Sequence, residues 1–324
     1  MAMNHFRFYR FLLIVFFIIP FKNIPTITNA FDTNYTPIQA KPNWQFLIPY
    51  QGNINPEAIR QAFLLNEGWD YLEDNFPSID KLNDPELKWQ KINLPHTWNA
   101  FDVTDNDPGY RRDANWYRKA IMIPDFDEPL IFRLYFEGVN ISCDVYVNGK
   151  KAGSHVGGYV GFTIDISPFI KKGTMNLIDV RADNSINPDI IPSQKSDFFI
   201  FGGITRDLWL QILSPTFIDQ IQISTPKVNE KTAETSASLT LIHHEEKEQK
   251  FTVEIAIKNP EGKIVSKKSM QTNLKPGMNT VSLNLPMVKK PALWSPEHPN
   301  LYEMTVQLQS DKIVDELSER FGYR

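Results

Sequence analysis

An acidic side chain stands at the start of a strongly aromatic run near the middle of the chain. Asp197 is followed by Phe198, Phe199 and Phe201 and then by a glycine pair at 202–203 that leads into a strand-like stretch. A carboxylate suits the recognition of hydroxyl groups, because charge-assisted hydrogen bonds are about twice as strong as neutral ones and are geometrically selective. The phenylalanines either offer apolar faces to a ring-shaped ligand or pack beneath the loop. The run therefore predicts a ligand-contacting loop on a β-rich scaffold.

The histidines and the single cysteine do not form a metal-binding pattern. His96 is expected to satisfy backbone groups, and the pair His243-His244, next to two glutamates, is expected to face solvent. Cys143 lies in a strand-like stretch and is expected to be a small buried hydrophobe; one cysteine can form no intrachain disulfide. Because no spacing of His, Cys and acidic residues matches a metal site, we expect no metal or other cofactor in this chain.

The residues around the aromatic run have the pattern of β-strands. Apolar and polar residues alternate with a period of two, which is typical of half-buried strands, and the alternation is clear at 130–136, 162–167 and 207–212. Asn148-Gly149 supplies two residues that tolerate a positive φ, as a two-residue hairpin turn requires. Arg206 and Asp207, at the start of a strand, are expected to form an ion pair or to bind loop carbonyls.

One short helix is predicted at Pro56 to Leu65. Asn55 can cap its first turn, and Pro56 occupies the first helical position, where its missing amide hydrogen is not needed.

A second all-β unit is predicted to begin near Ser214-Pro215, where the composition shifts toward Lys, Glu and Thr and aromatic residues become fewer. Its clearest strand places four apolar side chains on one face: Phe251, Val253, Ile255 and Ile257. Asn259 to Gly262 predicts a turn. About seven short strands after the break predict an immunoglobulin-like sandwich.

The first 30 residues have the layout of a secretory signal. Arg7 and Arg10 precede an apolar run at 11–19, and Thr28-Asn-Ala30 offers a small-residue cleavage site. The run is shorter than the about 20 residues of a membrane-spanning helix. The mature chain is therefore expected to be secreted or periplasmic, without a membrane; a retained N-terminal anchor is the alternative. Removal of 1–30 takes away three basic residues and no acid, so the formal net charge changes from −4 to −7, which argues against nucleic acid as a partner.

Several motifs follow one another along the chain: Asn93-Leu-Pro-His-Thr-Trp-Asn99, Phe136-Glu-Gly-Val139, Val145-Tyr-Val-Asn-Gly-Lys150, Gly157-Gly-Tyr159 and the run from Asp197 to Leu210. Together they resemble the non-catalytic N-terminal part of the family 2 glycoside hydrolases, which include β-galactosidases, β-glucuronidases and β-mannosidases. The resemblance covers roughly residues 60 to 324. It implies an all-β chain in which a galactose-binding-like jelly-roll sandwich is followed by an immunoglobulin-like β-sandwich.

The resemblance also implies how the chain is divided. The expected segments are a signal peptide at 1–30, an N-terminal extension at 31–55, a jelly-roll sugar-binding domain at 56–215, an immunoglobulin-like sandwich at 216–318 and a short lead-in at 319–324. The lead-in resembles the approach to the family's catalytic (β/α)8 barrel, and the barrel itself is expected to be absent from this chain.

Two substrate-binding residues follow from the resemblance. Asp197 matches a loop acid that reaches into the mouth of the barrel and accepts hydrogen bonds from sugar hydroxyls, and its spacing to Arg206 agrees with the family pattern. Asn99, with Asp102 after it, lies on a stretch that resembles the other site-facing loop. The alternative for Asp197 is a structural acceptor within its own loop.

No catalytic residue is predicted. Hydrolysis of a glycosidic bond takes two carboxylic residues, and in the family that this chain resembles both are glutamates on barrel strands. Asn66-Glu67 and Asn229-Glu230 lack the family's context, so both glutamates are interpreted as ordinary solvated carboxylates. The chain alone is therefore expected to be inactive, and whether it counts as an enzyme is left open.

Three functions of different classes fit these observations. The chain is the N-terminal portion of a secreted glycosidase that hydrolyses terminal β-glycosidic bonds in carbohydrate catabolism, or a stand-alone carbohydrate-binding module, or a piece that docks onto a separately encoded barrel. The expected partners are a terminal β-linked sugar and a catalytic barrel, in cis or encoded separately; a homo-oligomer is left open.

Overall fold

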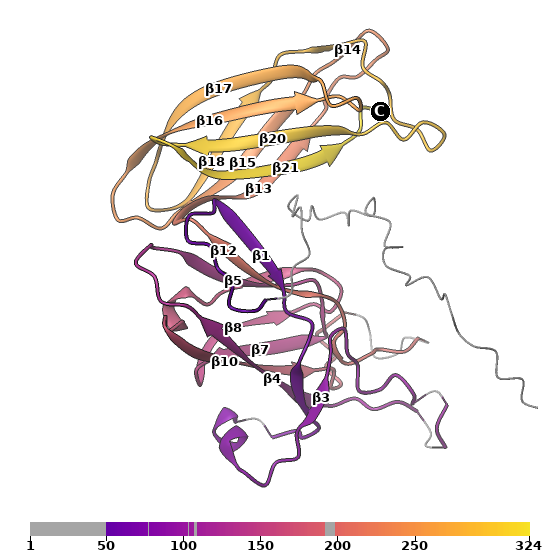
Figure 1. Cartoon of the computed structure of the whole chain (residues 1–324). Coiled ribbons are helices and arrows are strands. Elements are labelled where there is room, and N and C mark those ends of the chain that lie inside the picture. Colours follow the sequence, from indigo (N-terminus) through magenta and orange to yellow (C-terminus); the bar gives the residue numbers. More distant parts are fainter. Residues whose placement is uncertain (1–49, 77, 103, 107–108, 192–197) are drawn as a thin grey trace, which may run out of the picture. The chain divides into compact units, whose positions relative to one another are not determined.

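The computed structural model describes residues 50–76, 78–102, 104–106, 109–191 and 198–324, which belong to one compact unit. The expected signal peptide at 1–30 lies outside the described residues. Strands dominate what is described, and the two helical segments are short 3-10 turns, η1 (Ile79–Asn83) and η2 (Ser167–Phe169). The predicted all-β class is confirmed (Figure 1). None of the described helices is long and apolar enough to cross a membrane.

The first sandwich is built from two main sheets and a short pair. One sheet has the order β1 (Arg60–Leu64), β12 (Leu208–Leu213), β5 (Ile131–Phe136) and β9 (Phe162–Asp165). The other has the order β3 (Gln90–Ile92), β2 (Trp69–Leu72), β4 (Ala114–Ile123), β10 (Thr174–Asp183), β7 (Ser142–Val147) and β8 (Lys150–Val156). The short pair joins β11 (Gly203–Ile204) to β6 (Val139–Asn140). All strand pairings within this sandwich are antiparallel.

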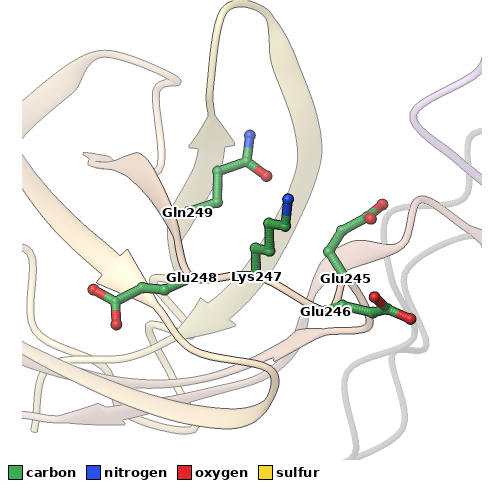
Figure 2. A pocket seen from close by; sticks show the side chains of 5 residues that line it. All are labelled: Glu245, Glu246, Lys247, Glu248 and Gln249. Carbon is green, nitrogen blue, oxygen red and sulfur yellow. The ribbon is translucent and has the colours of Figure 1, made fainter.

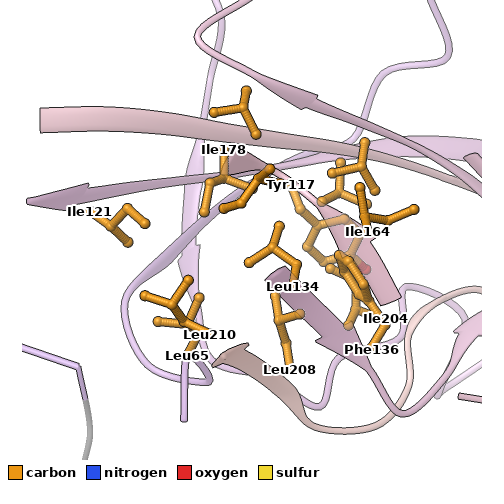
Figure 3. Packing of buried hydrophobic residues seen from close by; sticks show 14 of the residues in the cluster. Leu65, Tyr117, Ile121, Leu134, Phe136, Ile164, Ile178, Ile204, Leu208 and Leu210 are labelled. Carbon is orange, nitrogen blue, oxygen red and sulfur yellow. The ribbon is translucent and has the colours of Figure 1, made fainter. Parts of the chain in front are cut away.

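The alternation of apolar residues explains the core between these sheets. Phe132, Leu134 and Phe136 on β5 are buried, and they pack among side chains from β4, β10 and β12 (Figure 3). Cys143 lies in the same cluster, and burial raises the pKa of its thiol to about 12, so it behaves as the small hydrophobe that was predicted. The predicted hairpin turn is confirmed as well, because Asn148 and Gly149 both have positive φ between β7 and β8.

The predicted helix at Pro56 to Leu65 is wrong. Asn55 does cap a turn, since its side chain accepts from the amide of Glu57 at 3.1 Å, but the turn is not continued. From Arg60 onward the chain is strand β1, which pairs with β12 over its whole length. This long-range pairing buries Phe63 against the core, and it outweighs a local capping signal that stabilises a helix by only about 1 kcal/mol.

The second sandwich begins with β13 at Thr216, directly after β12 ends at Leu213. One sheet has the order β13 (Thr216–Ser224), β15 (Ser236–His243) and β18 (Gly277–Asn284). The facing sheet has the order β17 (Ile264–Leu274), β16 (Gln249–Lys258), β20 (Tyr302–Gln309) and β21 (Ile313–Phe321). These seven strands match the predicted number, and β14 (Thr232–Ala233) with β19 (Val288–Lys289) adds a short pair.

The predicted apolar face of β16 is confirmed, because Phe251, Val253, Ile255 and Ile257 are all buried in one cluster. The predicted turn at 259–262 is present too, closed by a bond from the amide of Gly262 to the carbonyl of Asn259 at 2.8 Å.

The expectation that both His243 and His244 face solvent is wrong for His243. Its side chain is fully buried because it continues the inward face of β15 after Leu239 and Leu241. One ring nitrogen contacts the hydroxyl of Thr216 at 2.7 Å, and the other contacts the carbonyl of Lys247 at 2.8 Å. Only His244 is exposed.

Candidate functional site

Asp197, the predicted sugar-binding acid, lies outside the described residues. The segment at 202–204 that follows it is hydrogen-bonded to the first sandwich through its backbone. β11 pairs with β6 on one side of this segment. On the other side the amide of His96 donates to the carbonyl of Ile204 at 2.8 Å. The amide of Trp98 donates to the carbonyl of Gly202 at 3.3 Å. The two predicted site-facing stretches therefore run next to each other.

The glycine pair is required by this close packing. A Cβ at Gly202 would lie 2.2 Å from the ring of Trp98, and a Cβ at Gly203 would lie 2.6 Å from the carbonyl oxygen of His96. Gly203 also has a φ of +127°, which side chains rarely adopt. Any larger residue at either position would push the loop away from the sandwich.

Asn99, the second predicted substrate-binding residue, is fully buried beneath this loop. Its Nδ2 donates to the carbonyls of Ile200 at 3.1 Å and Arg111 at 3.2 Å. Its Oδ1 accepts from the amide of Gly202 at 2.9 Å, 103 positions along the chain, and from the hydroxyl of Thr97 at 2.8 Å. The amide group thus has four partners within the protein, which makes Asn99 a positioning residue in this fold. A direct contact with sugar stays a prediction, and it would require some of these bonds to open.

Two further asparagines, which the sequence did not single out, complete the support of the loop. Asn184 donates to the carbonyl of Ile200 at 2.9 Å, and Asn140 donates to the carbonyl of Phe201 at 2.6 Å. Asn140 comes directly after the Phe136-to-Val139 motif, so its position was available as a signal. Asn184 follows β10 without a comparable motif. With Asn99, these residues bind the backbone of 200–202 from three separate segments of the chain.

The aromatic residues of the loop divide into two roles. Phe199 packs against Tyr110, with ring centroids 4.6 Å apart. Phe198 and Phe201 are 50% and 42% exposed, and Tyr159, 51% exposed, has its hydroxyl 3.5 Å from the Nδ2 of Asn140. Packing is thus observed for Phe199, whereas the half-exposed rings of Phe198 and Phe201 can present apolar faces to a ligand, and contact with a sugar stays a prediction.

The stretch at 93–99 packs against a cluster of uncharged ring side chains. The Nδ1 of His96 is 2.8 Å from the hydroxyl of Tyr117, and the ring of Tyr71 packs against His96 at 4.7 Å. Burial lowers the pKa of His96 and raises the pKa of Tyr71 to about 12, so both groups stay uncharged near neutral pH. The partner of His96 is thus a hydroxyl rather than a backbone group. Over the described part of the chain, no three His, Cys, Asp or Glu side chains are grouped as metal ligands.

Asp102 and Arg111 make contacts that support the loop around Trp98 and Asn99. The carboxylate of Asp102 accepts from the backbone amide of Arg111 at 2.6 Å. The guanidinium of Arg111 donates to the carbonyl of Trp98 at 3.0 Å and forms an ion pair with Glu73.

Asp207 is part of the joint between β1 and β12. Its carboxylate accepts from the side chain of Asn66 at 2.8 Å, and Asn66 in turn accepts from the amide of Leu208 at 3.1 Å. Asn66 is therefore a structural residue, and Glu67 beside it is exposed, as is Glu230. Neither of the two Asn-Glu pairs has a second carboxylate recorded as its partner in the described structure.

A group of three glutamates lies on the second sandwich, between β15 and β16. Glu245, Glu246, Lys247, Glu248 and Gln249 line a hollow of about 420 Å³. Figure 2 shows the side chain of Glu248 pointing away from those of Glu245 and Glu246, and Glu248 accepts from Asn273 at 2.9 Å. Hydrolysis would need two carboxyl groups flanking one bond, and these exposed groups do not converge in that way.

Comparisons with known proteins place both sandwiches in one family. The model of "Glycosyl hydrolases family 2, sugar binding domain" matches residues 56–214, and that of "Glycosyl hydrolases family 2" matches residues 216–324. A protein of Formosa agariphila named "Putative beta-glucuronidase" is 45% identical over 262 residues, which are 80% of this chain and 31% of that protein. A beta-glucuronidase of Bacteroides fragilis is 31% identical over 86% of this chain and 40% of its own length.

A solved structure agrees. Bacteroides uniformis beta-glucuronidase 2, covalently bound to cyclophellitol-6-carboxylate aziridine, superposes with a TM-score of 0.76 at 30% identity. The match covers 82% of this chain and 32% of that one. The chain belongs to glycosyl hydrolases family 2, and it comprises the family's sugar-binding domain and the immunoglobulin-like domain that follows. It spans about a third of the length of these relatives.

Proposed function

We propose that this chain supplies the sugar-contacting loop of a secreted β-glycosidase that removes terminal β-linked sugars in carbohydrate catabolism. The two catalytic carboxylates would belong to a (β/α)8 barrel, joined to the chain or encoded separately. Membership of the family supports the reaction class, and the relatives named above include beta-glucuronidases. The sequence pattern of residues 1–30 supports export, and the order of strands supports a jelly-roll assignment for the first sandwich.

The observation that carries this proposal is the support of residues 198–202. Three buried asparagines and a glycine pair hold a short aromatic segment whose rings at 198 and 201 remain half exposed. Holding irregular backbone with buried amides, while leaving apolar rings at the surface, favours ligand recognition over packing. Asp197 adjoins this segment in sequence and would accept hydrogen bonds from sugar hydroxyls.

The test restores a barrel. The chain is fused to the catalytic portion of a family relative, and hydrolysis of nitrophenyl β-glycosides is compared for the unchanged fusion, Asp197→Asn and Asp197→Ala. We expect Asp197→Ala to lower kcat/KM, with a loss of about 2 to 4 kcal/mol of transition-state stabilisation, because a charge-assisted bond to a hydroxyl is lost. Asp197→Asn should give a value between those of the unchanged fusion and Asp197→Ala. Equal rates for all three folded proteins would make the loop acid structural. The chain without a barrel should not exceed the blank with any glycoside.

A second candidate function is favoured by the exposed rings of Phe198, Phe201 and Tyr159. With these, the chain would bind carbohydrate as a module without any barrel. Titration of the chain alone with simple glycosides separates the two functions: saturable binding that Phe201→Ala abolishes supports the module, whereas binding that appears only in the fusion supports the shared site.

A further inference from the structure

The outer face of the three-stranded sheet in the second sandwich carries a regular array of uncharged polar side chains. The pairing register aligns them in three rows across β13, β15 and β18: Gln220, Thr240 and Thr280; Gln222, Ser238 and Ser282; Ser224, Ser236 and Asn284. All nine carry hydroxyl or amide groups, and none is charged. We call these nine residues the neutral array. Its members are exposed on the two outer strands and half-buried on β15.

Charge is rare on this sheet: the one charged residue on β13, β15 and β18 is Asp219, at the bulge before Gln220, and it forms an ion pair with Arg133. Charged residues make up 22% of the chain. The outer face of the other sheet in the same sandwich carries charges that pair across strands, with Lys258–Glu303 at 3.1 Å and Lys267–Glu254 at 2.7 Å. A sheet face that only contacts solvent has no reason to lack charged residues, because interspersed charges of both signs are what usually keeps a protein surface soluble. The contrast indicates a face that is adapted to an uncharged partner.

The array is hollowed and has unused hydrogen-bonding capacity. Two of its three rows line a hollow of about 440 Å³, which is within the size range of small-molecule sites. Among the described residues, the one hydrogen bond recorded between array side chains joins the hydroxyls of Ser282 and Ser238 at 3.4 Å. Hydroxyl and amide groups each combine donor and acceptor capacity, so the array can pair with groups that do both.

We propose that the neutral array is a binding surface for a neutral carbohydrate chain, separate from the loop of Asp197. Sugar hydroxyl groups also donate and accept, and neighbouring strands place array side chains about 4.8 Å apart, which is near the spacing of successive groups along an extended sugar chain. Beside the array, Met278 on β18 is 74% exposed, whereas its cross-strand partner Ile242 packs against a buried cluster that includes Phe217. Met278 would contact the apolar face of a sugar ring.

Charge decides between this ligand and others. An acidic glycan would need cations to pair with its carboxylates or sulfates. The array contributes none, and the ammonium of Lys268 at its edge already donates to the backbone carbonyl of Asn284 at 2.7 Å. Nine exposed or half-buried polar side chains also make a poor core for a dimer interface, since such cores are apolar and aromatic. A neutral glycan needs neither cations nor an apolar interface core. The surface would hold a polymeric substrate near the enzyme, so this inference adds to the proposed function without depending on Asp197.

The test is affinity electrophoresis of the full chain in gels that contain hydroxyethyl cellulose, galactomannan or polygalacturonate. We expect retardation by at least one neutral polymer and none by polygalacturonate. The double variant Ser238→Ala and Ser282→Ala should weaken that binding roughly tenfold, the effect of two lost neutral hydrogen bonds. The matched control, Thr252→Ala with Gln271→Ala on the outer face of the other sheet, should bind like the unchanged chain.

Asp197→Ala should also keep the retardation, which separates this surface from the proposed sugar-contacting loop. The inference is overturned if neither neutral polymer retards the chain, or if the double variant binds as well as the control. Binding to polygalacturonate alone overturns it too. So does dimerisation that the double variant abolishes, because the array would then be an interface between two copies. Melting temperatures of both double variants within a few degrees of the unchanged chain establish that folding is intact.

Discussion

The interiors of the two sandwiches differ in how they use polar side chains. The first contains five buried asparagines: Asn99, Asn115, Asn140, Asn176 and Asn184. The second contains no buried asparagine, although it has a similar number of apolar core residues. Both are built from antiparallel sheets, so the sheets themselves do not explain the difference.

The difference follows from the backbone that each sandwich must hold. A regular strand satisfies its own amides and carbonyls through the ladder, whereas an irregular buried segment needs side chains to do so. Three of the five asparagines bind the backbone of 200–202, and Asn176 binds the turn at 171–174. In the first sandwich, part of the interior therefore consists of amide side chains that hold loop backbone in place. In the second sandwich, the interior is mainly an apolar core that stabilises the fold, and the neutral array lies on the outer face.

The largest effect is expected from a charge in the apolar interior of the second sandwich. Val253 is buried on β16 between its partners Met270 and Leu308. Val253→Asp should lower the free energy of unfolding of this sandwich by about 4 kcal/mol or more, because no partner is available for the buried carboxylate. Urea unfolding followed by tryptophan fluorescence and circular dichroism measures it.

The matched control is Thr252→Asp, one position along the same strand on the outer face. It should change the unfolding midpoint little. Similar unfolding midpoints for Val253→Asp and Thr252→Asp would contradict the assignment of Val253 to the inner face of β16. The second sandwich would then not have the apolar interior that distinguishes it from the first.

A smaller loss is expected from the amide side of the comparison. Asn99→Ala leaves the carbonyl of Ile200 and the amide of Gly202 without one partner each, so the first sandwich should lose about 2 to 4 kcal/mol. Phe198→Ala, on the exposed part of the same segment, should cost well under 1 kcal/mol. Urea unfolding of the two variants gives both numbers.

An unchanged unfolding curve for Asn99→Ala would mean that the amide does not hold the loop. Its predicted role as a direct sugar contact would then regain weight. Hydrogen exchange at the amide of Gly202 gives an independent readout, because that proton should exchange faster in Asn99→Ala even if global stability is compensated elsewhere.

Much of the scaffold was predictable because a period of two fixes which side chains face inward. The stretches at 130–136 and 251–257 and the turn at 148–149 are cases in which local pattern and tertiary structure agree. The same rule, applied one residue further, would have placed His243 inside, since it continues the alternation of Leu239 and Leu241. For His243, position in the strand decides burial, although the polar type of the side chain favours exposure.

Other features could not be predicted from local pattern. At 60–64 the chain becomes a strand through pairing with β12, about 150 positions away, which a capping signal at Asn55 cannot reveal. The partners of Asn99 and Asn140 in the 200–202 segment are likewise 61 to 103 positions distant. The type and order of motifs indicated a site in this region, but the division between positioning residues and exposed rings depends on the three-dimensional packing.

The smallest effect concerns a carboxyl group on the inner side of the second sandwich. Glu319 follows Asp315 and Leu317 on the inward face of the edge strand β21, and burial raises its pKa from 4.5 to about 7. The folded protein therefore keeps this proton between about pH 4.5 and 7, where the unfolded chain has released it, so the free energy of unfolding should fall as pH rises through that window.

Glu319→Gln removes this dependence. Because the side chain is only partly buried, the variant should be more stable than the unchanged chain by about 1 to 2 kcal/mol at pH 8, with little difference at pH 4. Glu316→Gln, on the outward face of the same strand, should show no such pH-dependent gain. Thermal unfolding of the three proteins across pH 4 to 8 measures the difference. A gain of equal size at both pH values would show that Glu319 does not carry a raised pKa, and that the interior of the second sandwich holds no titrating acid at this edge.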